Sequence, residues 1–540
     1  MEVNMRAKLY AGILGMTAVA AVLLLAQSDT SAQSDTSSMR SWPPDVTQYS
    51  RSAIPADTIP LSLLQPQPLF AAPTVVDTVF SNTNATLKLT DTFNDGETSI
   101  GINRQDQSEI VITAFSGSWG TNAPLWHSTD GGNTWTKEFT IPVPPGVPSA
   151  IGCPCDQTVD YGHDRRLSGT FLTVGPTNVY SGTTTNPAMA PFWNWLVING
   201  VTQRTNSAGI NNADQPWLLV NRDPFTGGDK VYVAYDNFSG APDMRVAVSS
   251  AGSNPPNFTV DSLTGFSTGF VNPGHRLAAD PRNGAVYSLF QRRIAPGAGG
   301  SQNINYMLNM STDGGLTWIL NGSATGIVVA NADSTQPTPK FGGVNALLGG
   351  VLHAAVDPNT GNVYYVYGNR DAITGNNRIA IRRLQPVLGA FNTILIGPEH
   401  FVTGQVQAAI PSVAVANNGV VGVFYYTFNG IDSGFPQFSA HLSLSQNGGE
   451  TFTDRILETF LSPATDNGDP RQRVLGDYMQ LKALGGTFMG PLPGMAFHSA
   501  GHSPTTTRFS IDNRRTPTKG RQDQAPTTAV SMASRCALML

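Results

Sequence analysis

The sequence carries little charge and has no excess of basic residues. Only 13% of its 540 residues are Asp, Glu, Lys or Arg, against about 25% in an ordinary globular protein. The formal net charge is −5, so the chain lacks the basic character with which proteins bind phosphate backbones. We therefore expect no nucleic-acid partner.

Cysteine is scarce as well. Cys153 and Cys155 are separated by one residue, which is too close for an ordinary structural disulfide, and Cys536 lies in a predicted tail. A metal site would need more ligands nearby than His163 provides. We expect two thiols at Cys153 and Cys155, and neither a metal ion nor a cofactor.

The motifs of several large enzyme classes are absent. The chain has no phosphate-binding glycine-rich loop before a helix and no H-E-x-x-H sequence. Glycine and proline are instead abundant, with 55 and 38 residues. This abundance is typical of chains in which many turns join many short strands. The composition therefore predicts an all-β protein.

The first 32 residues predict a secretory signal peptide. The basic residues Arg6 and Lys8 precede an apolar run over residues 9–26, and small polar residues follow. We expect cleavage after Ala26 or Ala32, a location outside the cell or in its envelope, and no membrane span afterwards. Because the run is nearly long enough to cross a bilayer, an uncleaved anchor is the alternative.

One phrase occurs three times, beginning at Ser128, Ser311 and Ser445, and reads S-x-D/N-G-G-x-T followed by an aromatic residue. Its acidic or amide side chain can accept hydrogen bonds from the backbone, its glycines permit positive φ, and its aromatic residue can pack beneath the turn. The gaps of 183 and 134 residues correspond to three units of 61 and two of 67. Such a period predicts a propeller or a solenoid.

The phrase resembles the Asp box of BNR-repeat β-propellers, a family of sialidases and non-catalytic relatives. The phrases at Asp214–Trp217 and Leu475–Tyr478 are similar to those of secreted bacterial BNR proteins. The resemblance covers residues 95–500 and implies a sialidase-like β-propeller. We expect seven blades, because seven pairs of β-rich segments recur; six is the alternative, since the family's sialidases have six. The pairs are Ser99–Asn103 with Ile110–Phe115, Thr158–Tyr161 with Gly169–Val174, Trp217–Val220 with Val231–Tyr235, Leu277–Ala279 with Ala285–Phe290, Leu352–Val356 with Val363–Tyr367, Ser412–Ala416 with Val420–Tyr426, and Tyr478–Ala483 with Thr487–Phe497.

The predicted domain boundaries follow from these segments. We expect the propeller over residues 73–511, a disordered or extended linker over 33–72 and a disordered tail over 512–540. By analogy with the family, residues 75–80 and 85–89 are expected to supply a strand that closes the ring on the C-terminal blade. Residues 507–511 are a candidate for its last strand.

Blade geometry predicts where a ligand would bind. The starts of the first strands and the ends of the second strands share one face and converge on the channel mouth. A polar or charged residue stands at all seven starts; the alternative role for each is to bond neighbouring backbone. The residues at the starts are Glu97, Asp156, Asp214, His275 with Arg276, His353, Gln407, and Asp477 with Tyr478, and those at the ends are Trp119, Asp236, Asn237, Arg292, Arg293, Asn369, Arg370, Asp371, Tyr425 and Tyr426.

The resemblance to sialidases implies a specific chemistry for this mouth. Arginines would hold a sugar carboxylate, a tyrosine activated by a carboxylate would be the nucleophile, and a second carboxyl would be the acid. The F/Y-R-I-P motif of sialidases is missing, and residues 49–55 are its nearest approximation. The candidates are Tyr478 or Tyr426 as nucleophile, Glu97 as its base, Asp156 or Asp214 as acid, Arg276, Arg292, Arg293 and Arg370 as the clamp, and His275, His353 and Trp119 as further substrate contacts.

The competing hypothesis is a non-catalytic recognition or scaffold propeller. Under both hypotheses we expect a monomer whose partner is a carbohydrate or another polar polymer.

Overall fold

The computed structural model describes residues 74–79, 96–492 and 505–510, with short gaps in the middle range at 116–118, 120–122, 124, 139–140, 149–153, 174–176, 208–209, 241, 268–273, 298–299, 335–338, 350, 403–404 and 463. All of these residues belong to one compact unit, Leu69–Leu540. The predicted signal peptide, linker and tail lie outside the described residues, as does the segment 85–89.

The described chain is built from strands, with one short 3₁₀ helix at Ala190–Phe192. Three of its four-stranded sheets follow one another along the first half of the sequence. They are β2 (Ser99–Ile102), β3 (Ile110–Thr113), β4 (Leu125–Ser128) and β5 (Thr136–Glu138); β6 (Cys155–Tyr161), β7 (Leu167–Thr173), β8 (Asn178–Thr184) and β9 (Asn194–Trp195); and β12 (Ala213–Arg222), β13 (Asp229–Asn237), β14 (Asp243–Ser249) and β15 (Phe258–Phe266).

Three more sheets of the same kind follow. They are β16 (Arg276–Ala279), β17 (Val286–Pro296), β18 (Gln302–Ser311) and β19 (Ile327–Ser334); β20 (Leu352–Val356), β21 (Val363–Arg370), β22 (Asn377–Pro386) and β23 (Ile394–Phe401); and β24 (Ala408–Val415), β25 (Val421–Asp432), β26 (Phe435–Ser445) and β27 (Thr453–Leu461). A small hairpin, β10 (Val197–Ile198) and β11 (Val201–Thr202), stands apart from them.

A further four-stranded sheet joins the two ends of the described chain. It contains β28 (Lys482–Leu484), β29 (Thr487–Leu492), β30 (Thr505–Ser510) and β1 (Thr74–Val79), in the order β1-β30-β29-β28. Strand β1 pairs antiparallel with β30 from Thr74 opposite Ser510 to Val79 opposite Thr505. A closing strand is therefore present, and five of its six residues are Thr or Val, which are common in strands.

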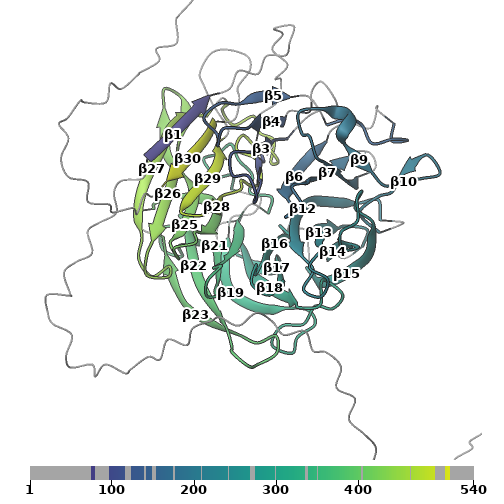
Figure 1. The fold of residues 1–540 in the computed structure, drawn as a ribbon. Coiled ribbons are helices and arrows are strands. Elements are labelled where there is room, and N and C mark those ends of the chain that lie inside the picture. Colours follow the sequence, from purple (N-terminus) through teal and green to yellow (C-terminus); the bar gives the residue numbers. More distant parts are fainter. Residues whose placement is uncertain are drawn as a thin grey trace, which may run out of the picture. The chain divides into compact units, whose positions relative to one another are not determined.

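The sheets are arranged as a β-propeller, as the sequence predicts (Figure 1). Strands β2, β6, β12, β16, β20, β24 and β28 are the inner strands of their sheets, and each of them from β2 to β28 contacts the next. Strand β29 in turn contacts β2. Six sheets thus consist of consecutive strands. The sheet β1-β30-β29-β28, which combines strands from both ends of the described chain, lies between the β24 sheet and the β2 sheet.

The inner strands are joined by a belt of side-chain hydrogen bonds. The hydroxyl of Ser99 accepts a bond of 3.0 Å from the backbone N–H of Val159, and that of Thr158 accepts one of 2.8 Å from Leu218. Side chains at three equivalent positions accept bonds of the same kind from the backbone of the next sheet. The equivalent residues, named the inner belt below, are Ser99, Thr158, Trp217, Arg276, His353, Ser412 and Gln480.

The inner belt gives the true period of the repeat. Ser99, Thr158, Trp217 and Arg276 follow one another at intervals of 59 residues, and so do His353 and Ser412. The other two intervals are longer. The mean units of 61 and 67 predicted from the turn phrase are therefore averages over a 59-residue unit and its insertions.

The three S-x-D/N-G-G-x-T turns share one geometry. In the first, the Ser128 hydroxyl accepts from Gly132 N at 2.9 Å, and Asp130 accepts from Thr134 N at 2.8 Å. The turns at Ser311 and Ser445 repeat both bonds. Each turn joins the third and fourth strands of its sheet, and its two glycines have positive φ between 72° and 89°. The phrase therefore closes hairpins, as predicted, and all three copies lie on one face of the ring.

Cys155 forms a disulfide bond. The expectation of a free thiol at this position is therefore wrong. Its partner is one of the other two cysteines, and both lie outside the described residues.

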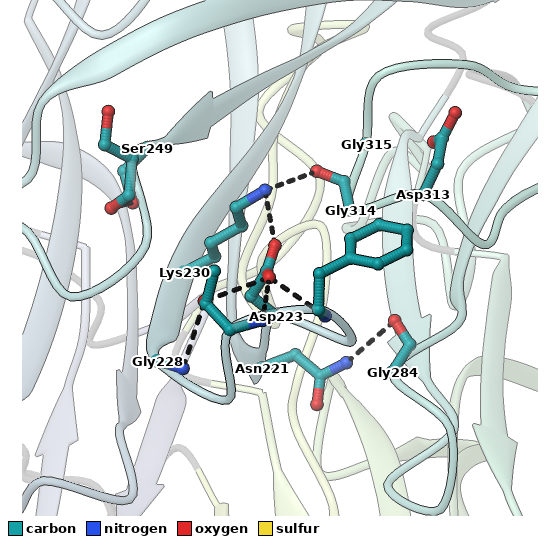
Figure 2. A network of polar contacts seen from close by, with 12 residues as sticks. Asn221, Asp223, Gly228, Lys230, Ser249, Gly284, Asp313, Gly314 and Gly315 are labelled. Atoms are coloured by element: carbon teal, nitrogen blue, oxygen red, sulfur yellow. Dashed lines mark hydrogen bonds and ion pairs between the residues drawn. The ribbon is translucent and has the colours of Figure 1, made fainter. Parts of the chain in front are cut away.

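A buried ion pair ties one of these turns to the neighbouring sheet (Figure 2). The ammonium of Lys230, on β13, lies 2.7 Å from the Asp223 carboxylate and donates a 3.3 Å bond to the carbonyl of Gly314 in the second turn. Asn221 adds a 3.3 Å bond to Gly284 O. Burial opposes ionisation of Asp223, but hydrogen bonds from Lys230 and Thr226 keep its pKa below the usual value.

Replacing Lys230 by Met should therefore destabilise the protein by about 1–3 kcal/mol, because the substitution leaves a buried carboxylate without its cation. Urea unfolding measures the change. The double variant Lys230→Met, Asp223→Asn should lose less than the sum of the two single losses. Additive losses would show that the pair does not couple the sheets.

Candidate functional site

A backbone kink precedes the inner belt in five of the sheets. The residue two positions before the belt residue has positive φ: 58° at Glu97, 24° at Asp156, 45° at Gln215, 58° at Gly274 and 56° at Ile410. Pairing registers shift at three of these places, as in a β-bulge. A non-glycine residue in this region is strained, and bulges commonly redirect a side chain. The kink therefore sets the direction of the Glu97 and Asp156 side chains.

Five carboxyl groups and two arginines gather at this end of the inner strands, and we name them the mouth cluster. Glu97, Asp156, Asp236, Asp477 and Arg276 are all buried, with at most 4% of their surface exposed. Asp214 and Arg473 are partly exposed. The members of the mouth cluster are Glu97, Asp156, Asp214, Asp236, Asp477, Arg276 and Arg473.

Polar contacts connect the two arginines through a glutamine. Arg473 Nη1 contacts the Asp477 carboxylate and lies 3.3 Å from Glu97 Oε1. Gln215 Nε2 donates a 3.0 Å bond to Asp477 Oδ2, while its Oε1 accepts a 3.2 Å bond from Arg276 Nη2. The backbone N–H of Asp477 also donates to Glu97 Oε1 at 3.2 Å. The first inner strand and the last are thereby held together at the mouth.

Aromatic rings form the base of the cluster. The Arg276 guanidinium carbon lies 4.7 Å from the ring centre of Trp217 and 5.0 Å from that of Tyr478. The two rings are 5.4 Å apart at 78°, and His353 packs on Trp217 at 5.5 Å. Cation–π contact compensates part of the cost of burying the arginine. At two positions of the inner belt, Trp217 and Arg276, stacking thus takes the place of the hydrogen bond to the backbone of the next sheet.

The carboxyl groups outnumber the cations, and their pKa values reflect it. Burial raises the pKa of Asp214 to about 7, with a further contribution from Asp156 and Asp477. Burial also raises the pKa of Asp477 to about 6, although Arg473 opposes the rise. Burial and the neighbouring carboxylates also raise the pKa of Glu97. Near neutral pH the cluster therefore holds protons that isolated carboxyl groups would have released.

Asp236 is the most isolated member. It has no exposed surface, and neither carboxylate oxygen makes a hydrogen bond of ordinary geometry. Burial and Asp214 raise its pKa well above the usual value, and Arg276 and the His275 backbone N–H offset only part of this. A buried carboxyl without partners is costly for stability.

Four of the five predicted catalytic residues lie in or against the mouth cluster: Glu97, Asp156, Asp214 and Tyr478. Tyr478 is fully buried, and its hydroxyl donates a 3.4 Å bond to the Gln157 carbonyl; none of its described hydrogen bonds is to a carboxylate. Burial and the carboxylates around it raise its pKa well above the usual value. This environment opposes its predicted role as an activated nucleophile.

Tyr426 lies elsewhere, in an environment that opposes its predicted role. Its ring is fully buried and packs at 5.1 Å from Phe424 and 6.1 Å from Phe460 in the core of the β24 sheet. Trp119, predicted to stack on a sugar, is likewise a core residue with a ring contact of 5.8 Å to Phe171. Sequence position alone could not distinguish rings that face the mouth from rings that fill the blades.

The predicted arginine clamp does not form among the described contacts. Arg276 belongs to the mouth cluster, whereas Arg292 donates a 3.0 Å bond to Phe266 O and covers the Phe266 ring. Arg293 is the next residue along β17, and Arg370, at the end of β21, donates to Gly375 O at 2.9 Å.

The two predicted histidines have structural roles. His275 is fully buried, and its ring nitrogens lie 2.7 Å from Ser288 Oγ and 3.3 Å from Tyr235 O. His353 accepts a 3.2 Å bond from the Val413 N–H as a member of the inner belt. Burial lowers the pKa of both to about 3, so both are neutral.

Arg473 and Gln215 were not among the predicted site residues, and Asp236 and Asp477 were assigned only to the polar ring. The Asp214–Trp217 and Leu475–Tyr478 phrases singled out in the sequence pointed to Gln215 and Asp477. Asp236 gave a weaker signal, since it only ends a second strand. Arg473 gave no signal in the sequence. It lies four residues before Asp477, and the sequence does not show that the backbone turns there and brings the two side chains together.

Within the part of the chain that the structure describes, no group of three or more His, Cys, Asp or Glu side chains could hold a metal ion. The same part contains no helix long and apolar enough to cross a membrane.

Comparison with known proteins finds distant structural similarities and no sequence match. No protein-family model and no curated protein matches the sequence. Among solved structures, a protein of unknown function from Dyadobacter fermentans is 13% identical with a TM-score of 0.38, and the match covers 81% of this chain and 99% of that one. The polysaccharide lyase Uly1 is 10% identical with a TM-score of 0.44, covering 78% and 90%. An endo-1,5-α-L-arabinanase from Thermotoga petrophila is 10% identical with a TM-score of 0.31, covering 78% and 100%.

The mouth cluster predicts an unusual dependence of stability on pH. The folded-state pKa of Asp236 exceeds the unfolded value of about 4. Above that pH the folded state binds more protons than the unfolded state, so the free energy of unfolding falls as pH rises. Asp236→Asn removes this cost and should stabilise the protein at pH 8 by about 1–3 kcal/mol, with little effect at pH 4.

Denaturant unfolding at both pH values measures this change. Asp130→Asn is the control of opposite sign, because hydrogen bonds from Thr134 lower the pKa of Asp130 to about 2. Its variant should be less stable than the wild type above pH 4, and the difference should shrink as pH falls towards 2 because the wild type then loses this contribution. Equal stability of the wild type and Asp236→Asn at pH 8 would contradict the account of the cluster.

Proposed function

We propose that the mouth cluster binds carbohydrate and cleaves a glycosidic bond, with Asp214 as the proton donor. The observation that carries this proposal is the position of Asp214: it is a partly exposed carboxyl group on a buried acidic cluster, and its pKa is raised to about 7. An acid with such a pKa keeps its proton near neutral pH and can protonate the leaving oxygen as the glycosidic C–O bond breaks. Water forms the new bond to the sugar carbon, and its proton passes to a carboxylate of the cluster.

The surrounding carboxylates have a second use in this reaction. Cleavage of a glycosidic bond passes through a transition state with positive charge on the sugar ring. Asp156 and Asp477, which act electrostatically on Asp214, provide negative charge close to it. The solved structures of similar fold include proteins named as a polysaccharide lyase and an arabinanase; the proposal rests on the cluster, not on those names.

A neutral sugar fits the mouth better than an anionic one. The cluster holds five carboxyl groups against two arginines, and Arg276 is covered by Trp217 and Tyr478. Only Arg473 among these cations is partly exposed, and it already pairs with Asp477 and Glu97. A sugar carboxylate would be repelled here, so a sialidase is the less favoured form of the proposal.

We further propose that the protein is a secreted, seven-bladed Asp-box propeller. The sheet β1-β30-β29-β28 supports the seventh blade, because it lies between the sheets that start with β24 and β2. The shared geometry of the three S-x-D/N-G-G-x-T turns supports the family. Export rests on the apolar run at residues 9–26.

Burial of most of the mouth cluster favours a second candidate, a recognition propeller without catalysis. Four of the five carboxyl groups are at most 4% exposed and can hold the inner strands together without touching a ligand. The two candidates differ in what Asp214 does once a sugar is bound.

An assay of the full chain against arabinan, xylan, ulvan and sialyllactose separates them. Asp214→Asn should lower kcat on the cleaved polymer by about 100-fold or more while KM changes little, because the amide cannot donate a proton as an acid. The activity of the wild type should fall as pH rises through about 7. Asp432→Asn, at an exposed carboxyl on β25, is the matched control and should keep full activity.

Cleavage that survives Asp214→Asn would refute the assigned role. Binding of a polymer with no release of new chain ends by the wild type would support the recognition propeller.

A further inference from the structure

The channel contains a cavity at the other end of the inner strands from the mouth cluster. This cavity of about 370 Å³ is lined by residues of all seven inner strands and by Pro281 and Pro358, which belong to turns that follow β16 and β20. The mouth cluster lies before the inner strands, whereas this cavity lies along and after them. Trp217 stands between the two, since it lines the cavity and stacks on Arg276. The sequence predicted a ligand site only at the first end.

Small side chains create the space. The residues two positions after the inner belt are Ala278, Ala355 and Ala414 in three neighbouring sheets, and all three line the cavity. Leu277, Val356 and Val413 complete an apolar wall.

Two of the equivalent positions in other sheets carry charge instead. Asp160 stands two residues after Thr158, and Lys482 two residues after Gln480. Lys482 Nζ donates a 2.7 Å bond to Asp160 Oδ1, and Arg104 Nη2 lies 3.7 Å from Asp160 Oδ2. Asp160, Lys482 and Arg104 are the charged residues of the lining, and together they carry one net positive charge.

Protein groups already occupy the hydrogen-bonding capacity of the Asp160 carboxylate. Besides the two cations, it accepts bonds from Val220 N at 2.9 Å and Tyr161 N at 3.1 Å. Lys482 has three N–H groups, and its described hydrogen bond uses one of them. The Lys482 and Arg104 side chains are 24% and 31% exposed, so a ligand can reach both. The cavity therefore offers donors and positive charge, with its acceptor occupied.

We propose that this cavity binds a small monocarboxylate with an apolar body. Lys482 and Arg104 hold the carboxylate, and the alanine and valine wall together with Trp217 packs against the body. The volume lies within the range of about 300–1,000 Å³ found for small-ligand sites. The proposal is independent of the function assigned to the mouth cluster.

Calorimetric titration of the full chain with hexanoate, 1-hexanol and glucuronate tests the ligand class. Hexanoate should bind about 10-fold or more tightly than the isosteric alcohol, because only the acid makes the charge-assisted bonds. It should also bind more tightly than glucuronate, whose hydroxyls find no partners along the apolar wall. Quenching of tryptophan fluorescence provides a second readout, since Trp217 lines the site.

Two variants locate the binding. Lys482→Met should weaken hexanoate about 10-fold or more. Since that change can also destabilise Asp160, Ala355→Leu fills the cavity with all charges retained and should abolish binding. Lys340→Met, which removes an ion-paired lysine that is not among the cavity-lining residues, is the matched control. Asp214→Asn should leave binding unchanged, which separates this site from the mouth cluster.

Any one of three results would overturn the proposal: 1-hexanol binding as tightly as hexanoate, a folded Ala355→Leu variant that binds normally, or no binding of hexanoate at concentrations of about 10 mM.

Discussion

A hydrogen bond from one inner strand to the next organises this molecule. At five of the seven belt positions a polar side chain accepts a bond from the backbone of the following sheet, beginning with Ser99 and Val159. Each such bond contributes about 1 kcal/mol. More importantly, each fixes the height of one sheet against its neighbour, so residues 59 positions apart come to the same level of the channel.

The two belt positions without such a bond explain the asymmetry of the channel. Trp217 and Arg276 replace a bonded polar side chain by a stacked pair, which Tyr478 and His353 extend. This stack separates an acidic mouth from a cavity with surplus positive charge. One plane of residues thus divides the channel into two sites of opposite character.

The crowded mouth is costly, and the rest of the fold supports it. Buried carboxyl groups and strained residues such as Glu97 reduce stability. Functional sites commonly contain groups that lower the stability of the fold in this way. The sheet that joins β1 to β30 and the three identical hairpin turns provide stabilising contacts far from the mouth.

Much of the fold was predictable, because strands and turns depend on local sequence. The first and second strands of the six sheets that begin with β2, β6, β12, β16, β20 and β24 occur where alternating apolar residues and Asn/Asp/Gly turns placed them. Strands β28 and β29 cover part of the last predicted pair, and β1 pairs with β30. The site was predictable only in part. The first-strand starts pointed to Glu97, Asp156 and Asp214, which the structure brings together because topology alone places those positions at one end of the inner strands.

The rest of the site depends on which way each side chain faces. Tyr426 and Trp119 occupy suitable places in the sequence but point into the core, and the predicted clamp arginines at Arg292 and Arg370 bind local carbonyls instead. Arg473 is brought to Glu97 only by the closure of the ring, over a separation of 376 residues.

The central claim is that burial, together with the neighbouring carboxylates, holds a proton on Asp214 near neutral pH. Carbon-13 NMR of protein labelled at the aspartate carboxyl carbons measures this directly, with Asp214 assigned by the signal that Asp214→Asn removes. The account predicts a titration midpoint near 7. A midpoint near 4, the value of an isolated aspartate, would contradict it.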